Sequence, residues 1–156
     1  MTTVVRTHKV LVNAPLQSTF SYISDLTRHP EWSGGELRIE ALTPGPVAVG
    51  KEYFSRGEVA IQKDRPNKVK ITDYEPPHKF GFVAEDPDFG NVSHVFTFNK
   101  QNGGVLIQRT MTVSLNPIVA FLFRFFIYPL IGKPSMDKSL AALRTRLEKD
   151  IEDASH

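Results

Sequence analysis

The sequence predicts one α+β domain, in which a curved antiparallel sheet closes over a long C-terminal helix and leaves an apolar cavity. Three observations support this fold class. A strand-like run at the start is followed by two short helical segments. The middle of the chain alternates short runs of β-favouring residues with turn signals, which is typical of an antiparallel meander. The end of the chain carries apolar residues at helical spacing.

Length and composition limit the possible classes of protein. A chain of 156 residues has the usual size of one domain, so we expect residues 1–156 to form a single domain. Hydrophobic residues make up 40% and charged residues 23%, which excludes a disordered chain. The formal net charge is only +2 and no run of Lys and Arg is present, so nucleic acid is not an expected partner. The absence of cysteine excludes disulfides, thiol nucleophiles and Cys-ligated metals.

The first part of the chain predicts a strand and two short helices. A run rich in valine and threonine indicates a strand with one buried face, formed at alternate positions by Val4, Arg6, His8, Val10 and Val12. This run lacks the apolar core of a signal peptide, so we expect a cytoplasmic protein. Asn13-Ala14-Pro15 is typical of the cap and first turn of a helix, and Phe20 and Ile23 follow at helical spacing. Residues 26–35 predict another short helical turn and then a loop.

The middle of the chain predicts six further strands. Asn102-Gly103 gives the strongest turn signal, because both residues accept the positive φ angles of a type I′ hairpin turn. The other predicted turns contain proline, and they lie at Pro44-Gly45-Pro46, Arg65-Pro66-Asn67, Pro76-Pro77 and Asp86-Pro87-Asp88. The strands are predicted at residues 37–42, 51–59, 69–74, 79–85, 91–99 and 105–115.

The Asn102-Gly103 turn also predicts the register of the last hairpin. With these two residues as the loop, Phe98 lies opposite Ile107, Phe96 opposite Arg109, His94 opposite Met111 and Val92 opposite Val113. One face of the hairpin is then almost wholly apolar, and a slip of one residue would destroy that pattern. His94 and Arg109 are the exceptions on this face, where they become diagonal neighbours about 7–8 Å apart at the backbone.

The C-terminal part predicts two helical segments. Asn116-Pro117 is a good cap and first helical position, but Pro129, Gly132 and Pro134 are expected to break or kink the helix. The apolar stretch of residues 118–131 is shorter than the roughly 18–20 residues that a membrane span needs. An apolar stripe for packing on the sheet then follows at Met136, Leu140, Leu143, Leu147 and Ile151.

Several short motifs, in this order, resemble the polyketide cyclase/dehydrase-like branch of the START-related superfamily, also called SRPBCC or Bet v 1-like proteins. The motifs span nearly the whole chain and are Asn13-Ala14-Pro15, Asp25-Leu26-Thr27-Arg28, Pro30-Glu31-Trp32, Leu42-Thr43-Pro44-Gly45-Pro46, Val49-Gly50, Ile71-Thr72-Asp73-Tyr74-Glu75-Pro76-Pro77, Gly103-Gly104 and Leu147-Glu148. The resemblance implies a helix-grip fold, in which a seven-stranded sheet surrounds a long helix and a cavity separates them. Members bind lipids, sterols, polyketides or hormones, and some catalyse cyclisation or dehydration. The superfamily shares no catalytic signature, so the resemblance leaves the chemistry open.

Our leading hypothesis is that the protein binds a small hydrophobic ligand, without a cofactor, between the sheet and the C-terminal helix. We expect the polar groups that orient this ligand to be Tyr53, His94 and Arg109. The walls of the cavity are expected to come from Phe82, Phe96, Met111, Leu140 and Leu143.

A second hypothesis is a cyclase or dehydratase, in which His94 transfers a proton and Arg109 holds an oxyanion. These two residues are then the candidate catalytic pair. The alternatives are a structural core role for His94 and, for Arg109, either a place at the cavity rim or an ion pair with one of three carboxylates. Those carboxylates are Asp73, Glu85 and Asp86.

A third hypothesis is a membrane-associated lipid carrier or partner-binding module. Residues 121–128 hold more large apolar side chains than one helix face can bury, including Phe121 and Phe125. They could form a lid that contacts the ligand, the interface of a homodimer, or a membrane-contacting surface on a monomer.

The five histidines show no metal-binding spacing, and Gly103-Gly104 opens no helix that could bind phosphate, so no metal or nucleotide site is predicted.

Overall fold

One antiparallel sheet and one long helical segment make up most of the structure. The computed structural model describes residues 1–33, 35–59, 62–87 and 90–154. Its seven strands follow the order β1-β7-β6-β5-β4-β3-β2 across the sheet. The strands are β1 Thr2–Val12, β2 Leu37–Ala41, β3 Glu52–Val59, β4 Gln62–Glu75, β5 Lys79–Asp86, β6 Gly90–Gln101 and β7 Gly104–Leu115. The helices are α1 Leu16–Ser24, the 3₁₀ turn η1 Leu26–Glu31, α2 Pro117–Leu122, the π-helical η2 Phe123–Gly132 and α3 Lys133–Ala154.

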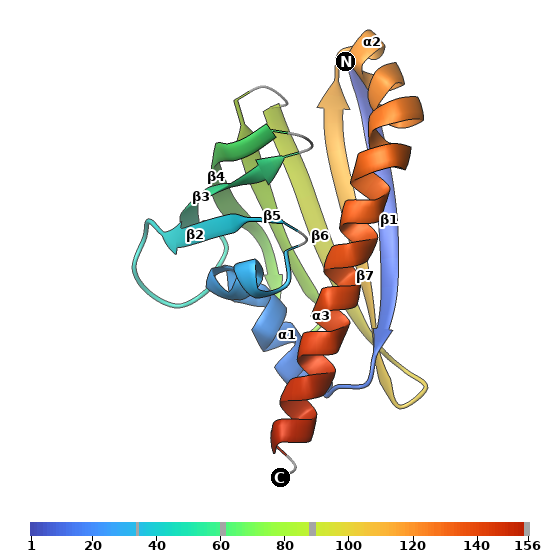
Figure 1. The fold of residues 1–156 in the computed structure, drawn as a ribbon. Coiled ribbons are helices and arrows are strands. Elements are labelled where there is room, and N and C mark those ends of the chain that lie inside the picture. Colours follow the sequence, from blue (N-terminus) through green and yellow to red (C-terminus); the bar gives the residue numbers. More distant parts are fainter. Residues whose placement is uncertain (34, 60–61, 88–89, 155–156) are drawn as a thin grey trace.

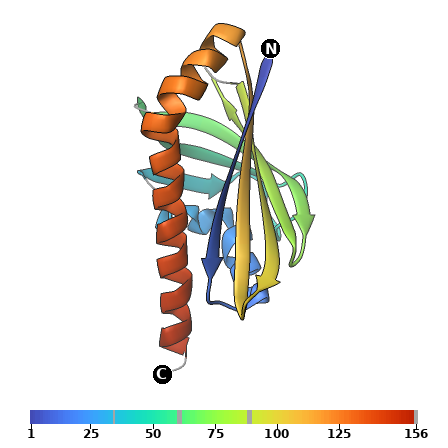
Figure 2. The ribbon, with the colours of Figure 1, turned by 90° about the vertical axis from the view of Figure 1, so that its right-hand side faces the viewer.

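The sheet bends around the C-terminal helix, as the sequence predicts for this fold class (Figures 1 and 2). Register shifts interrupt the ladders between Gly57 and Val59 and between Ile71 and Asp73. Such bulges bend a strand and increase its twist, so they help to give the sheet its concave face. The short helix α1 and the turn η1 lie near one end of this concave face, and α3 runs along its open side (Figure 2).

The predicted β6–β7 hairpin is confirmed in turn and in register. Asn102 and Gly103 form the two-residue loop with φ angles of 49° and 77°, the left-handed values that a type I′ turn requires. All four predicted inward pairs occur, and they are Phe98 with Ile107, Phe96 with Arg109, His94 with Met111 and Val92 with Val113. The hairpin therefore carries His94 and Arg109 on the concave face.

The prediction of a turn at Arg65-Pro66-Asn67 is wrong, because β4 begins at Gln62 and passes through Pro66. Pro66 pairs with Arg56 of β3, whereas the pairing of β4 with β5 begins only at Lys68. The missing N–H of proline is tolerated where a strand has a neighbour on one side only. The predicted turn at Asp86-Pro87-Asp88 lies between β5 and β6, and its last residue is outside the described part of the chain.

Two expectations about helix boundaries also need correction. Asn13 is not the cap of α1, because the helix begins after Pro15 and the Asn13 backbone N–H donates to Glu148 Oε1 at 3.0 Å. Of the two outcomes predicted for Pro129, Gly132 and Pro134, the break is wrong and the kink is confirmed, because the helix continues from α2 through η2 into α3 with a bend (Figure 2). The hydrogen bonds of a π-helix skip one more residue than those of an α-helix, and such a segment leaves room for a proline ring.

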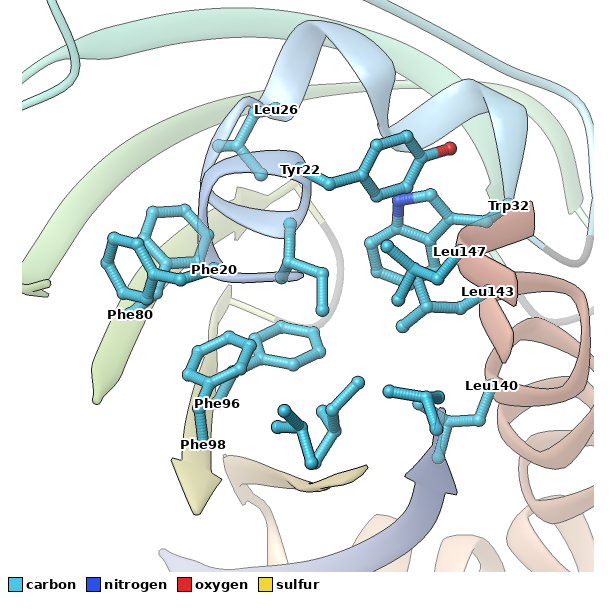
Figure 3. Close-up of a cluster of buried hydrophobic side chains, with 14 of the residues drawn as sticks. Phe20, Tyr22, Leu26, Trp32, Phe80, Phe96, Phe98, Leu140, Leu143 and Leu147 are labelled. Carbon is cyan, nitrogen blue, oxygen red and sulfur yellow. The ribbon is translucent and has the colours of Figure 1, made fainter. Parts of the chain in front are cut away.

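The main core fills the part of the concave face nearest α1. Phe80, Phe96 and Phe98 of the sheet meet Phe20 of α1 and Leu143 of α3 there (Figure 3). Trp32 is 2% exposed and packs edge to face against Phe96. This packed region fixes α3 to the sheet.

Candidate functional site

A cavity of about 540 Å³ lies between the concave face of the sheet and the segment formed by η2 and the start of α3. This volume lies within the range of roughly 300–1,000 Å³ that is typical of small-molecule sites. Its apolar lining includes Leu26, Leu37, Ile39, Val69, Phe82, Ala84, Val92, Met111, Val113, Leu115, Phe123, Ile127, Ile131 and Met136. Its polar lining includes His29, Ser55, Asn67, Asp86, His94, Arg109, Tyr128, Ser135 and Lys138.

Arg109 is the buried cation of this cavity, with 6% of its surface exposed. Its Nη1 donates to Ser139 Oγ at 3.4 Å, and its Nε and Nη2 lie 3.4 and 3.3 Å from His94 Nδ1. These contacts are longer than most N–H···O bonds, and no described carboxylate lies within ion-pairing distance. Burial lowers the pKa of Arg109 to about 10, so the guanidinium is still charged at neutral pH.

Two aromatic rings lie beside the Arg109 guanidinium. Its central carbon is 5.3 Å from the ring centre of Phe96 and 5.9 Å from that of Trp32. Such contacts stabilise a cation through the negative face of the ring, but by much less than a buried carboxylate would. The charge of Arg109 is therefore only partly compensated within the described protein.

The two histidines that line the cavity are neutral near pH 7. Burial, and then the charge of Arg109, lowers the pKa of His29 to about 3 and holds that of His94 well below its usual value. Because Arg109 donates to His94 Nδ1, the proton of neutral His94 lies on Nε2. His94 thus offers one hydrogen-bond donor. His29 stacks on Trp32 with ring centres 4.1 Å apart.

The comparisons with known proteins assign a family to this arrangement of sheet, helix and cavity. Residues 1–148 match the family described as polyketide cyclase/dehydrase and lipid transport. The chain belongs to this family. No protein with curated annotation matches the chain.

Solved structures of similar fold agree with the helix-grip architecture of the polyketide cyclase/dehydrase family. The KanY protein (ms6282), solved by NMR, has 21% identity and a TM-score of 0.69, with 95% of this chain and 99% of that chain covered. TTHA0849 from Thermus thermophilus has 18% identity and a TM-score of 0.73, with 92% and 97% covered. The di-domain ARO/CYC BexL from the BE-7585A biosynthetic pathway has 14% identity and a TM-score of 0.73, with 94% and 50% covered. At these identities the likeness establishes the fold alone.

Four of the predicted site residues line the cavity of this family member: Phe82, His94, Arg109 and Met111. The predicted proximity of His94 and Arg109 is confirmed by their side-chain contact. The alternative of an ion pair with Asp73, Glu85 or Asp86 is wrong, because the polar contacts of the Arg109 guanidinium are with His94 and Ser139. Asp73 pairs instead with Lys79 at 3.0 Å, and Asp86 with Arg65 at 3.5 Å. The alternative of a position at the cavity rim is also wrong, since Arg109 is buried.

The other predicted site residues lie outside the cavity lining. Tyr53, Phe96, Leu140 and Leu143 belong to the packed core, where each is at most 3% exposed. Phe121 and Phe125 point away from the cavity and are 55% and 58% exposed. Phe123, Ile127 and Tyr128 of the same segment line the cavity instead, because they lie on the inner side of the helix.

Sequence reasoning missed a polar group beside the cavity. His8 lies between Tyr128 and Asp137 and accepts or donates hydrogen bonds with both. No sequence signal joins these three residues, which come from β1, η2 and α3. Alternation within the first strand places His8 on the buried face, but only the pairing of β1 with β7 brings it next to Arg109. Within the described part of the chain, no three His, Asp or Glu side chains gather closely enough to hold a metal ion.

Proposed function

We propose that this protein binds a small, mostly apolar molecule in its cavity and holds an anionic or carbonyl oxygen of that molecule at Arg109. The single observation that carries this proposal is a buried guanidinium that lines an apolar cavity and has no described carboxylate partner. A buried charge is costly unless it is paired, so a ligand oxygen would stabilise it. Arg109 has N–H groups left for such a bond beyond those directed at His94 and Ser139.

Two fluorescent probes of similar size can test this proposal. Anilinonaphthalene sulfonate and phenylnaphthylamine share an aromatic skeleton, but only the first carries an anion. We expect both to bind to the wild-type protein, with the sulfonate bound more tightly. Arg109→Met should weaken the affinity for the sulfonate by about tenfold or more and leave the affinity for phenylnaphthylamine nearly unchanged.

Arg124→Met is the matched control, because Arg124 is exposed on the helix and does not line the cavity. It should alter neither affinity. Failure of both probes to bind, or equal loss of the sulfonate in both variants, would contradict the proposed role of Arg109.

A second candidate is a cyclase or dehydratase that acts on a carbonyl substrate, which the family description also covers. The geometry that favours it is the pair of donors, Arg109 and the neutral His94, that face the cavity. Together they would stabilise a developing oxyanion in an apolar site, where such stabilisation is strong. Once a substrate is known, His94→Ala should abolish turnover and preserve folding. Full activity of that variant would rule His94 out.

A third candidate is lipid exchange at a membrane surface, favoured by the apolar side chains exposed on α2 and η2. Phe121, Phe125, Phe126 and Leu130 are each more than half exposed. By length and composition alone, the helix Pro117–Ile151 is long and apolar enough to cross a membrane. We expect the wild-type protein to float with liposomes and the Phe125→Asp variant to float less. Flotation that is unchanged by Phe125→Asp would exclude this surface, and a concentration-dependent dimer would indicate self-association instead.

A further inference from the structure

Tyr128, His8 and Asp137 form a hydrogen-bonded row from the cavity wall to the protein surface. The Tyr128 hydroxyl lies 2.6 Å from His8 Nε2, and His8 Nδ1 lies 3.0 Å from Asp137 Oδ1. His8 is 6% exposed, whereas the side chain of Asp137 is 49% exposed and also accepts a hydrogen bond from Lys133 Nζ at 2.7 Å. The middle member of the row is thus shielded from water, and the last member is not.

The donors and acceptors of this row fix the direction of its hydrogen bonds. The hydrogen bond from Lys133, and then that from His8, lowers the pKa of Asp137, so its carboxylate can only accept at neutral pH. His8 Nδ1 therefore donates to Asp137, which leaves Nε2 to accept the proton of the Tyr128 hydroxyl. Burial raises the pKa of Tyr128, so its hydroxyl is protonated before a ligand binds.

The row lies next to Arg109 on the concave face. His8 is the direct partner of Arg109 in the β1–β7 ladder, and directly paired residues on one face are about 4.5–5.5 Å apart. Tyr128 and Arg109 both line the cavity. A ligand that fills the cavity would therefore contact both groups.

Charged residues surround His8 on three elements, which are β7, its own strand β1 and the helix α3. Arg109 lies opposite on β7, and Arg6 of β1 places its guanidinium 4.9 Å from the ring centre of Tyr128. Asp137 and Lys133 face His8 from α3 as an ion pair. Asp137 would stabilise a proton on His8, and the two arginines would stabilise negative charge on a ligand beside Tyr128.

We propose that Tyr128, His8 and Asp137 form a proton relay that takes the acidic proton of an enol or phenol bound in the cavity, so that Arg109 holds the resulting oxyanion. The ligand O–H bond breaks, and its proton passes to the Tyr128 oxygen. The Tyr128 proton passes at the same time to His8 Nε2. The products are a ligand oxyanion and an imidazolium at His8 beside the Asp137 carboxylate, and no other reactant takes part. This inference rests on the proposed ligand binding and assigns a substrate class to the same cavity.

A nitronaphthol provides the test, because its ionised form absorbs light at longer wavelength than its neutral form. At a pH about one unit below its pKa in water, the wild-type protein should bind it mainly as the oxyanion. Tyr128→Phe keeps the ring but removes the hydroxyl, so the ratio of ionised to neutral bound nitronaphthol should fall about tenfold. Asp137→Asn should lower this ratio in the same direction, because His8 then loses the carboxylate that stabilises its proton.

Two further measurements separate the relay from a merely structural role. Tyr22→Phe is the matched control, since Tyr22 donates to Glu31 at 2.8 Å and does not line the cavity, and it should leave the ratio unchanged. Nitrogen NMR of the His8 ring should show imidazolium when wild-type protein binds nitronaphthol, and neutral imidazole with phenylnaphthylamine.

The outcomes distinguish the relay from ligand binding itself. Equal ionisation in wild type and Tyr128→Phe at equal occupancy, or a His8 ring that stays neutral, would overturn the relay and leave the proposed binding function intact. If wild-type protein binds neither nitronaphthol nor the two naphthyl probes, both proposals fail together.

Discussion

Arg109 directs two of its nitrogens at a single atom of its neighbour, Nδ1 of His94, at 3.4 and 3.3 Å. This contact orients the guanidinium and selects the tautomer of His94, but it does not neutralise the charge. Under the proposed binding function, the buried arginine would hold a ligand at the expense of the stability of the ligand-free protein, a common compromise in functional sites.

The first prediction concerns the stability of the ligand-free protein. Arg109→Met replaces a buried, only partly compensated cation with an apolar side chain of similar length and should raise the free energy of unfolding by about 1 kcal/mol or more. Urea denaturation measures this change. Arg109→Lys keeps the charge and should not stabilise the protein, and a destabilising Arg109→Met would mean that the guanidinium contacts outweigh its desolvation.

The second prediction is a loss of stability in mild acid caused by His29. Its pKa is 6.5 in the unfolded chain and about 3 in the folded protein, so between these values the unfolded state binds a proton that the folded state does not. Stability should fall as the pH drops below about 6.5 and should be unaffected by His29 above it.

His29→Gln isolates this effect from the carboxylates that also titrate in acid. Between neutral pH and about pH 5, the variant should lose about 1 kcal/mol less stability than wild type. This figure is discounted for solvent screening, because the His29 ring is only partly buried. Thermal melts across this pH range measure the difference. Parallel curves for the two proteins would show that the pKa of His29 is the same in the folded and unfolded states.

The third prediction separates the gripping part of the long helix from its exposed part. Leu143 is fully buried between α3 and the sheet (Figure 3), so Leu143→Ala should cost about 2–5 kcal/mol of unfolding free energy. Leu130 of η2 is 74% exposed, and Leu130→Ala should change stability by less than about 0.5 kcal/mol. Chemical denaturation of both variants provides the comparison, and a large loss for Leu130→Ala would indicate that η2 is covered in solution.

The fourth prediction concerns two adjacent glycines that are required for different reasons. Gly103 has a φ of 77° with open space around it, so Gly103→Ala should cost about 1–2 kcal/mol through backbone strain alone. At Gly104 a methyl group would overlap the carbonyl oxygen of Val12, so Gly104→Ala should cost more and should disturb the start of the β1–β7 pairing. Thermal melts rank the two variants, and amide NMR shifts of Val12 locate the disturbance.

The parts of the fold that the sequence predicts correctly depend on local signals. Asn102-Gly103 determines a turn geometry, and the alternation on both sides of it then determines the register that brings His94 near Arg109. The same local reasoning fails at Pro66, because proline is a turn signal unless the strand has a free side. Whether that side is free depends on where β5 begins to pair, which no local pattern reveals.

The candidate site is only half predictable for a similar reason. Phe82 and Met111 follow from strand alternation, but Phe96 shares this alternation and lies in the packed core. Leu140 and Leu143 follow from helical spacing and lie in the same core. Periodicity identifies the inward face and cannot tell where along that face packing ends and empty space begins. His8 requires the contact of the first strand with the last, which depends on the order of the whole sheet.

The π-helical segment η2 determines how the residues at the start of the long helix are rotated about the helix axis relative to α3. Each residue of an α-helix turns the chain by about 100°, so an offset of one residue is enough to carry a side chain from one side of the helix to another. If one residue were deleted within η2 so that regular α-helical bonding returned, α3 would still grip the sheet through Leu143. Phe123, which now faces the cavity, would rotate relative to α3. The wide turns of η2 thus allow its side chains to face the cavity while α3 keeps its packing against the sheet.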